Sequence, residues 1–557
     1  MPRESLIQAL SDALARAQSA GDIPDASSPE VELLTPRDPR HGDFSSSLAL
    51  ALASETGRAP RELAETLVRH LELPEGIVES VSIAGPGFVN FVLSPAWLRG
   101  VVRQVLERGE DYGRSNAGEG KRLLLEFVSA NPTGPVGVVQ GRAAAIGDTL
   151  ASLFERTGWK VSREYYINDA LNSTQIQRFA ATLEARYLQQ LGHEAAVPED
   201  GYQGDYVITM ADELVQAEGD RYLAMTPEER LAAFYEQSLR NIVSSHQRDM
   251  DAFGVRFDTW FYESTLYENH EVESAIDALK ARGHTYESED ALWFKATEFG
   301  DTQDQVLVRR DGRPGYLAAD IAYHKNKFDR AFDRLIDIWG PDHQGHVTRT
   351  KAGVQALGYE PQRFEILIHQ FVRLFRGSEM VRMSKRAGDI VPLSGLLDDV
   401  GPDAARFFFL MQSMESHLDF DLELAKKQAA DNPVYYVQYA HARICSILRE
   451  AEERGASPPG MAEANLDRLG EPDELSLMRK LAELPREISE AAQRYEPHRM
   501  TRYARELAAT FHGFYANCRV LGDDPELTAA RLALVQAALT VLHIALTIMG
   551  VSAPEKM

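Results

Sequence analysis

Cysteine is nearly missing from this sequence: Cys445 and Cys518 are the only two in 557 residues. Two thiols cannot build a disulfide framework, and they cannot supply a four-cysteine zinc site. The small disulfide-rich scaffolds and the four-cysteine zinc modules are therefore excluded. We expect both cysteines to be core residues.

Long apolar runs are also missing. The first residues, MPRESLIQALSDALARAQ, have apolar positions at helical spacing but lack the continuous apolar stretch of a signal peptide. We expect no other segment to offer the roughly 18 consecutive apolar residues that a membrane-spanning helix needs. The sequence therefore predicts a soluble, cytoplasmic protein with no membrane partner.

Basic residues are in deficit, because 84 Asp and Glu face 59 Lys and Arg and the formal net charge is −25. Such a surface excludes a protein that coats nucleic acid nonspecifically, and we expect no DNA partner. A large acidic protein can still bind a specific RNA through local basic patches. With 44% hydrophobic and 26% charged residues, the composition is otherwise that of ordinary globular protein.

The length predicts several domains, since single cores stop growing at roughly 250–300 residues. Residues 1–112 combine helical runs with a strand–turn–strand pattern around Gly-Pro-Gly, which predicts an α+β unit. Residues 113–420 open with strand, turn, helix and strand, which begins a Rossmann-type parallel sheet, and a mostly helical insertion interrupts it at about 170–255. Residues 421–557 have an all-helical pattern. The predicted fold class is therefore multidomain α/β.

Four later stretches are predicted to form the second half of the parallel sheet. They are ALWFKATEFG, QVLVRR, RLIDIWG and FEILIHQFVRLF, which are short and apolar. Parallel sheets bind their ligands outside the carboxyl ends of the strands. The loops that follow these strands are therefore the places to look for chemistry.

Two such loops could bind phosphate. The first, around Gly134 and its flanking prolines, delivers a helix N-terminus whose free N–H groups favour anions, or it simply connects a strand to a helix. The second, VRMSKRAGD at 381–389, clusters Lys and Arg and is preceded by Arg373 and Arg376. It could neutralise a polyphosphate or form a solvated basic loop. The position of both loops after predicted strands favours binding.

Together these loops resemble the ATP site of the class I aminoacyl-tRNA synthetases, which pairs a "HIGH" loop with a "KMSK" loop. Arg382-Met383-Ser384-Lys385 matches the second loop, with arginine in place of its first lysine. EFVSANPTGP, REYYINDA, GYLAADIAYHKNKFDR, WGPDHQGHVTR and NPVYYVQYAHARICSILREA further resemble the arginyl members of this family. These stretches occur in the right order, and the resemblance covers nearly the whole chain.

The first loop departs from the family pattern. Gly137-Val138-Val139-Gln140 stands where the family has His-x-Gly-His, so both imidazoles are absent. The Gln140 amide can donate a hydrogen bond, but unlike histidine it cannot take up a proton and become positively charged. The resemblance implies a catalytic role for Gln140, Arg382, Ser384 and Lys385. It implies ATP-binding roles for Ala130, Pro132, Thr133, Gly134, Pro135, Gly137, Gly141, His343 and Met383.

A pocket selective for arginine needs carboxylates at the edge of a planar cation that has five donors. Tyr316 and Asp320 are four residues apart in a predicted helix, so they share one face, although such a pair could also be a structural hydrogen bond. By resemblance, Glu126, Tyr316 and Asp320 bind the guanidinium. Asn131 and Gln344 are similarly implied to hold the carboxylate and amino groups of the amino acid.

Metal ligation and RNA binding have separate signals in the sequence. His343 and His346 have no third ligand at suitable spacing, so we expect no protein-held metal and no zinc, with Mg²⁺ arriving on ATP.

Arginines and aromatics alternate in PHRMTRYARELAATFHGFYANCRV and suit unstacked bases, although several of these aromatics must be core. By resemblance, this C-terminal domain binds the anticodon and residues 1–112 bind the tRNA elbow. The implied tRNA contacts are Arg502, Tyr503, Tyr515 and Arg519.

The resemblance implies an ATP-dependent aminoacyl-tRNA ligase that joins L-arginine to its tRNA through an arginyl-adenylate and acts as a monomer. Its partners would be arginine and tRNA. The altered loop motivates one alternative, a noncatalytic synthetase paralogue that binds tRNA or arginine. A synthetase for another amino acid is a further alternative, but an uncharged substrate would leave the pocket carboxylates unpaired.

Overall fold

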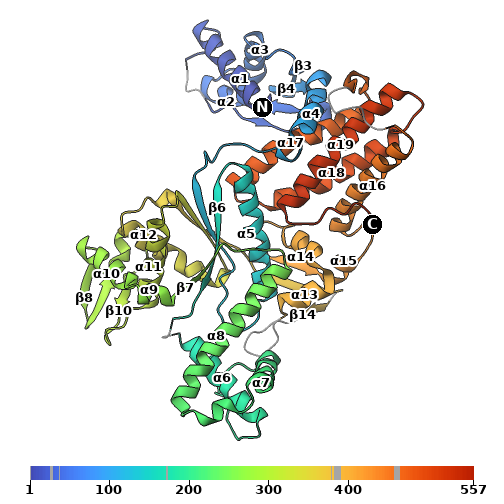
Figure 1. Cartoon of the computed structure of the whole chain (residues 1–557). Helices are drawn as coiled ribbons and strands as arrows, with labels where there is room; N and C mark the ends of the chain where they lie inside the picture. The colour runs from blue at the N-terminus through green and yellow to red at the C-terminus, as the bar shows by residue number, and fades with distance from the viewer. Residues whose placement is uncertain are drawn as a thin grey trace.

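The computed structural model describes residues 2–25, 29–36, 38–170, 173–377, 379–381, 391–456 and 464–557. Figure 1 shows an N-terminal α/β unit, a central sheet with helices on both sides, a helical insertion and a helical C-terminal domain. The predicted fold class is confirmed. The proposed domain boundaries at 112 and 420 stay predictions.

The N-terminal unit is built on a four-stranded antiparallel sheet of order β1-β2-β4-β3. The predicted strand–turn–strand is its β3–β4 pair, whose register runs from Val78 opposite Leu93 to Ala84 opposite Phe88. The elements of this part are α1 (Pro2–Ser19), β1 (Leu33–Leu34), η1 (Pro39–His41), β2 (Phe44–Ser46), α2 (Leu48–Thr56), α3 (Pro60–Arg69), β3 (Val78–Ala84), β4 (Phe88–Leu93), α4 (Pro95–Arg108) and η2 (Gly109–Asp111).

The central sheet has five parallel strands in the order β12-β11-β5-β6-β7. Its elements are β5 (Arg122–Glu126), α5 (Val138–Arg156), β6 (Lys160–Ile167), β7 (Thr259–Tyr262), α11 (Tyr316–Asp329), β11 (Arg334–Trp339), η5 (Pro341–His346), α12 (Val347–Ala356), η6 (Pro361–Arg363) and β12 (Phe364–Ile368). The predicted strand–turn–helix–strand corresponds to β5, the loop after it, α5 and β6. Helix α5 begins at Val138.

Alternating side chains of β5 explain why both faces of this sheet are covered. Leu123 and Leu125 pack into the core that includes α5, whereas Leu124 packs with Phe328 of α11 and Val354 of α12 on the other face. All three leucines are at most 1% exposed. A strand buried on both sides needs a continuous apolar run, and the LLL of this strand supplies it.

The insertion between β6 and β7 consists of α6 (Thr174–Gln190), α7 (Asp205–Glu218), η3 (Arg221–Ala224) and α8 (Pro227–Ala252). Helix α8 begins with a capping box, in which Thr226 and Glu229 satisfy each other's backbone N–H groups. Figure 1 shows α8 running from the outer end of the insertion back to the central sheet. The predicted helical character of this segment is confirmed.

The predicted second half of the parallel sheet is partly wrong. ALWFKATEFG and QVLVRR contribute β9 and β10 to a separate antiparallel sheet of order β10-β9-β8. FEILIHQFVRLF is two strands, β12 in the central sheet and β13 in a further three-stranded sheet of order β14-β13-β15. The elements between β7 and α11 are α9 (Ser264–Glu268), α10 (Glu271–Ala281), β8 (Thr285–Ser288), β9 (Ala291–Phe294), η4 (Ala296–Phe299) and β10 (Gln305–Val308). Those after β12 are β13 (Val372–Arg376), β14 (Glu379–Val381), α13 (Leu393–Val400), α14 (Pro402–Phe409), β15 (Leu418–Asp421) and α15 (Leu422–Lys426).

The C-terminal domain contains α16 (Pro433–Glu453), η7 (Leu466–Arg468), α17 (Pro472–Gln493), α18 (His498–Asn517) and α19 (Pro525–Ile548). Contrary to the expectation from sequence, α19 is long and apolar enough to cross a membrane, but 67% of its apolar window is buried. It is the core helix of this domain and packs against α16, α17 and α18. Cys518 is buried as expected, whereas Cys445 is only partly buried.

Candidate active site

The chain reverses its strand order between β5 and β11, at the centre of the parallel sheet. From β5 the chain proceeds to β6 on one side, and from β11 it proceeds to β12 on the other. Such a switch point opens a crevice outside the carboxyl ends of the two strands. The loop at 127–137, which contains the Pro/Gly turn, follows β5, and η5, which contains the PDHQGH segment, follows β11. Both segments therefore lie at this crevice.

The loop after β5 begins in an unusual backbone conformation. Val128 has φ 71° and Ser129 has φ 38°, in the left-handed region that a β-branched residue such as valine rarely adopts. Such conformations cost about 1–3 kcal/mol each and persist only where neighbouring contacts hold them. Here the Ser129 hydroxyl donates to Glu126 Oε1 at 2.7 Å and accepts from the Tyr166 N–H at 3.1 Å.

The same loop ends at the N-terminus of α5. Gly137 is the N-cap with φ −91° and ψ 170°, and the Val138 N–H donates to the Val391 carbonyl at 3.3 Å. The N–H groups of Val139 and Gln140 have no acceptor among the described residues. Two free donors at the positive end of a helix dipole form a binding site for an anion. A Cβ on Gly141 would lie 2.6 Å from Leu393 Cδ1, so glycine is required there for α5 to pack on α13.

Two carboxylates, Asp320 on α11 and Glu263 after β7, lie close together beside Tyr166 of β6, and we call this pair the acidic pocket. Asp320 is partly exposed, and neither it nor Glu263 makes an ion pair with any described residue. Burial raises the pKa of the Asp320 carboxyl, although His324 and Arg349 oppose this shift. Two adjacent carboxylates that make no ion pair with a described residue form a site that favours a cationic ligand.

Glu263, one residue after β7, was not predicted from the sequence. It is 5% exposed and forms a hydrogen bond with the Tyr166 hydroxyl. Burial raises its pKa to about 7, with further upward shifts from Asp320 and Asp169. The Asp169 carboxylate itself accepts from the Ser264 N–H and hydroxyl at 2.8 and 2.7 Å. An acid directly after a parallel strand was the only signal in the sequence that could have identified Glu263.

The other buried carboxylates near this pocket are already paired. Lys327 is 0% exposed, and its Nζ donates to Glu126 Oε2 and to Asp337 Oδ1, the latter at 2.7 Å. Asp337 also bonds His324 Nε2 at 2.8 Å. Each oxygen of Glu126 thus accepts one hydrogen bond, from Ser129 or from Lys327, and keeps a lone pair, so its predicted guanidinium contact stays a prediction.

The remaining predicted arginine contacts surround this acidic pocket. Tyr316 is the first residue of α11, one turn before Asp320 as predicted, and it is 58% exposed. The Arg309 guanidinium lies over its ring, 5.4 Å from the centroid. Asn131 and Gln344 are exposed on the loop after β5 and on η5. Both stay predictions.

The two predicted histidines lie on η5 with ring centroids 5.6 Å apart. Burial lowers the pKa of His346. No group of three or more His, Cys, Asp or Glu within the described ranges is placed to hold a metal ion. The predicted catalytic and ATP contacts Arg382, Met383, Ser384 and Lys385 lie outside the described residues, so their roles stay predictions.

The predicted tRNA contacts on α18, and Arg519 just after its end, divide into two groups. Arg502, Tyr515 and Arg519 are exposed, and the Tyr515 ring has Arg443 stacked over it at 5.3 Å. Tyr503 is 1% exposed, and its hydroxyl donates to the Lys480 carbonyl at 2.9 Å. The prediction for Tyr503 is wrong because its ring fills the core between α17 and α18.

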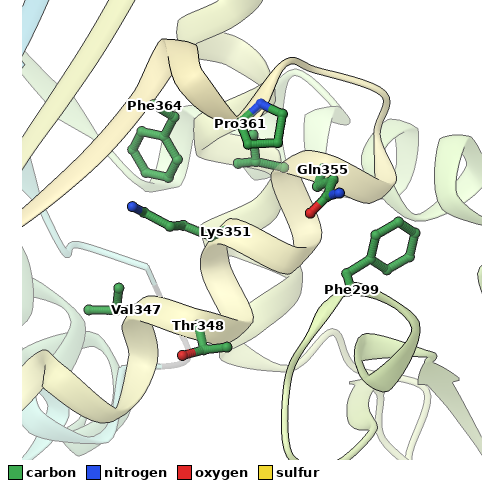
Figure 2. Close-up of a pocket in the computed structure, with 8 residues that line it drawn as sticks. Phe299, Val347, Thr348, Lys351, Gln355, Pro361 and Phe364 are labelled. Carbon is green, nitrogen blue, oxygen red and sulfur yellow. The ribbon is translucent and has the colours of Figure 1, made fainter. Parts of the chain in front are cut away.

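Two hollows lie outside the active site. Figure 2 shows one of about 280 Å³ between η4, α12 and the start of β12, with Phe364 at its wall. Since Phe364 begins β12, this hollow lies at the amino end of that strand, away from the crevice. The other, of about 490 Å³, separates the N-terminal unit from α17 and is lined by Arg40, Arg479 and Arg486.

Three family descriptions match consecutive parts of the chain. "Arginyl tRNA synthetase N terminal domain" matches residues 4–93, "tRNA synthetases class I (R), catalytic domain" matches 101–440, and "DALR anticodon binding domain" matches 437–557.

Curated relatives and solved structures agree with this assignment. The arginine–tRNA ligase of Moorella thermoacetica is 50% identical over 555 residues, which is 100% of this chain and 99% of the relative. That of Heliobacterium modesticaldum is 49% identical over 559 residues, again 100% and 99%. The fold is similar to Thermus thermophilus arginyl-tRNA synthetase, with TM-score 0.76, 23% identity and 100% of both chains covered. With a relative this similar over its full length, and a catalytic-domain match across more than half of the sequence, the chain belongs to the arginyl-tRNA synthetases of class I.

Proposed function

We propose that this chain joins L-arginine to its tRNA at the crevice between β5 and β11, using ATP to form an arginyl-adenylate first. The observation that carries the proposal is the pair Asp320 and Glu263. Around them three other buried carboxylates have cations, since Glu126 and Asp337 pair with Lys327 and Glu164 pairs with Arg330 at 2.5 Å, while Asp169 accepts two hydrogen bonds from Ser264. Asp320 and Glu263 have no such pair among the described residues, and arginine supplies the missing cation.

In the first step the amino acid carboxylate attacks the α-phosphate of ATP, and pyrophosphate leaves. Asp320 and Glu263 hold the guanidinium, with Tyr316 at the pocket mouth, while Asn131 and Gln344 hold the carboxylate and amino groups. The free N–H groups of Val139 and Gln140 face the nucleotide phosphates. Lys385 and Arg382 neutralise the leaving pyrophosphate. These groups act by positioning and by charge, without a covalent enzyme intermediate.

In the second step the adenylate acylates the terminal adenosine of tRNA and AMP leaves. Mg²⁺ would arrive with ATP, because phosphate oxygens and water are its usual ligands and the described residues provide no metal cluster. Arg502, Tyr515 and Arg519 present cationic and aromatic surface to the anticodon, and the N-terminal unit contacts the tRNA elbow. We further propose that the protein works as a monomer in the cytoplasm.

Arginine-dependent pyrophosphate exchange and tRNA charging, each measured with and without tRNA, test this function. We expect exchange that requires arginine and charging of arginine tRNA. If neither reaction occurs even when tRNA is present, the protein is a noncatalytic member that binds tRNA or arginine. If another amino acid supports the exchange better than arginine, the assignment of the acidic pocket is wrong.

Arginine binding should become tighter as the pH rises from 6 to 8. Burial raises the pKa of Glu263 to about 7, and a guanidinium binds only its deprotonated form. The deprotonated fraction falls about tenfold from pH 8 to pH 6, so the Kd of arginine should rise about tenfold. Calorimetry in buffers of different ionisation enthalpy should also show proton release at pH 7. Glu263→Gln should remove the pH dependence; a Kd that does not change with pH in the natural protein would contradict the assignment.

Restoring the two signature histidines should accelerate activation. Gly137 has φ −91°, which any residue adopts, so Gly137→His introduces no backbone strain. Since one preorganised donor to a transition state is worth about 10²–10³ in kcat, Gly137→His with Gln140→His should raise kcat for pyrophosphate exchange by at least about tenfold. Gln140→Ala is the comparison and should lower it. Unchanged exchange in the double variant would mean that other groups already stabilise the phosphates.

A further inference from the structure

The insertion reaches the ATP loop through His246 on α8. This histidine is 0% exposed, and its ring touches two groups of the crevice. Nε2 lies 2.8 Å from the Gly134 carbonyl, and Nδ1 lies 2.9 Å from the Tyr165 hydroxyl. A carbonyl oxygen can only accept, so Nε2 carries a hydrogen and donates it. The neutral ring then accepts the Tyr165 hydroxyl hydrogen at Nδ1.

Tyr165 extends this chain to the start of the loop. Its hydroxyl oxygen accepts the Ala130 N–H at 3.2 Å while its hydrogen goes to His246. One imidazole and one phenol therefore hold two backbone groups of the loop, the Ala130 N–H and the Gly134 carbonyl. The Tyr165 side chain is 0% exposed and stacks on Trp260 at 4.3 Å, so it has a fixed position.

Two further side chains of the insertion hold the same loop. Asp249, three residues after His246 on α8, accepts the Val136 N–H. Tyr206 on α7 donates its hydroxyl hydrogen to the Thr133 carbonyl at 2.9 Å. A Cβ on Gly134 would lie 3.1 Å from this hydroxyl, so the loop and α7 are in close contact. The backbone from Ala130 to Val136 is thus held at four points, three of them by the insertion.

These contacts end where the proposed phosphate site begins. Val136 is followed by the N-cap Gly137 and by the free N–H groups of Val139 and Gln140. The loop lacks the signature imidazoles, so its contribution depends on where its backbone donors point. A displacement of about 1 Å in such a site can lower the rate about 10²-fold.

We propose that His246, together with Tyr165 and Asp249, is a positioning residue for the ATP site, and that the helical insertion acts in catalysis as the support of this loop. The inference rests on the proposed function, since it concerns the same nucleotide site. It assigns to α8 an effect that falls mainly on ATP, because Asp320 and Glu263 lie on α11 and after β7, and of the proposed arginine contacts only Asn131 belongs to the held loop.

His246→Leu and His246→Gln test the inference. Leucine fills the space but donates nothing, whereas the amide nitrogen of glutamine can replace Nε2 and donate to the Gly134 carbonyl. We expect His246→Leu to lower kcat/KM for ATP in pyrophosphate exchange about 10- to 100-fold and to weaken ATP binding measured by calorimetry. The Kd of arginine should rise clearly less than the Kd of ATP, because Asn131 is the one proposed arginine contact on the held loop. His246→Gln should recover most of the loss, and Tyr165→Phe should give an intermediate effect.

Ser238→Ala is the matched control. Ser238 is also on α8 and 0% exposed, and its hydroxyl donates to the Tyr235 carbonyl without touching the loop. The inference is overturned if His246→Leu has the ATP parameters of Ser238→Ala, or if arginine and ATP binding weaken equally in His246→Leu and His246→Gln. Direct ATP binding separates this result from failure of the proposed function. A natural protein that binds ATP but catalyses no exchange would refute the ligase activity, while the comparison of ATP affinities would still decide the role of His246.

Discussion

Asp320→Asn should abolish most of the selectivity for arginine while leaving the arginine-free protein at least as stable. Truncating one side of a buried hydrogen-bonded charge pair typically costs about 2–5 kcal/mol, so kcat/KM for arginine should fall roughly 30- to 5,000-fold. Without arginine the effect has the opposite sign. The Asp320 charge lies beside Glu263 with no ion-pair partner among the described residues, so asparagine relieves repulsion and loses no ion pair.

Asp329→Asn on the same helix provides the matched control. Asp329 pairs with Lys325 at 2.6 Å, its side chain is 53% exposed, and it lies away from the acidic pocket. The Asp329→Asn variant should leave kcat/KM for arginine unchanged. Pyrophosphate exchange gives kcat/KM, and thermal unfolding with and without arginine gives the two stabilities. The pocket assignment would be wrong if Asp320→Asn kept its response to arginine, or if it unfolded earlier than the natural protein without ligand.

The sequence allowed the elements around the proposed site to be predicted, because strand–turn–helix signals are local. The apolar LLL run, the Pro/Gly turn and the amphipathic helix after it predicted β5, its loop and α5. Tyr316 and Asp320 follow Pro314 in a segment that becomes the first turn of α11. Since carboxyl ends of parallel strands meet at one edge, assigning the strands was enough to bring these motifs together.

Strand partners were predicted less well, because a short apolar run has the same pattern in either kind of sheet. Ala291–Phe294 and Gln305–Val308 are four residues each and pair antiparallel with each other, apart from the central sheet. Thr259–Tyr262, in contrast, is an edge strand of the central sheet whose four residues are all half-buried. Its lack of alternation explains why both the strand and Glu263 after it were missed.

The supporting side chains could not be found from local patterns. Lys325 and Lys327 are two residues apart on α11, yet Lys325 is partly exposed beside Asp329 and Lys327 is 0% exposed. What distinguishes them is Glu126, which is 201 residues away in the chain. His246 is similar, because an isolated histidine on an apolar helix face is also expected in an ordinary core. Both assignments depend on partners that only the folded chain brings together.

Lys327→Met should be the most destabilising change of those considered. It would leave Glu126 and Asp337, which are 4% and 1% exposed, without their shared ammonium. Removing one partner of a buried ion pair costs about 3–5 kcal/mol, because the remaining charge is buried and uncompensated. Since a chain of several domains does not unfold in one step, hydrogen exchange of β5, β11 and α11 is the suitable measurement. Lys325→Met removes only the partly exposed ion pair between Lys325 and Asp329, so it should lower the free energy of unfolding by at most about 1 kcal/mol.

Combining Lys327→Met with Glu126→Gln should recover much of this loss. The second change removes the unpaired carboxylate, Asp337 keeps His324 as its partner, and the neutral amide oxygen introduced by Glu126→Gln can still accept the Ser129 hydroxyl hydrogen. If exchange protection returns and pyrophosphate exchange returns with it, the lysine acts through charge balance alone. If protection returns but activity does not, the ionised Glu126 is needed to hold Ser129 and the strained start of the ATP loop in place. A double variant no more protected than Lys327→Met would contradict the charge-balance argument, because it removes the Glu126 charge and leaves only Asp337, still bonded to His324, without the ammonium.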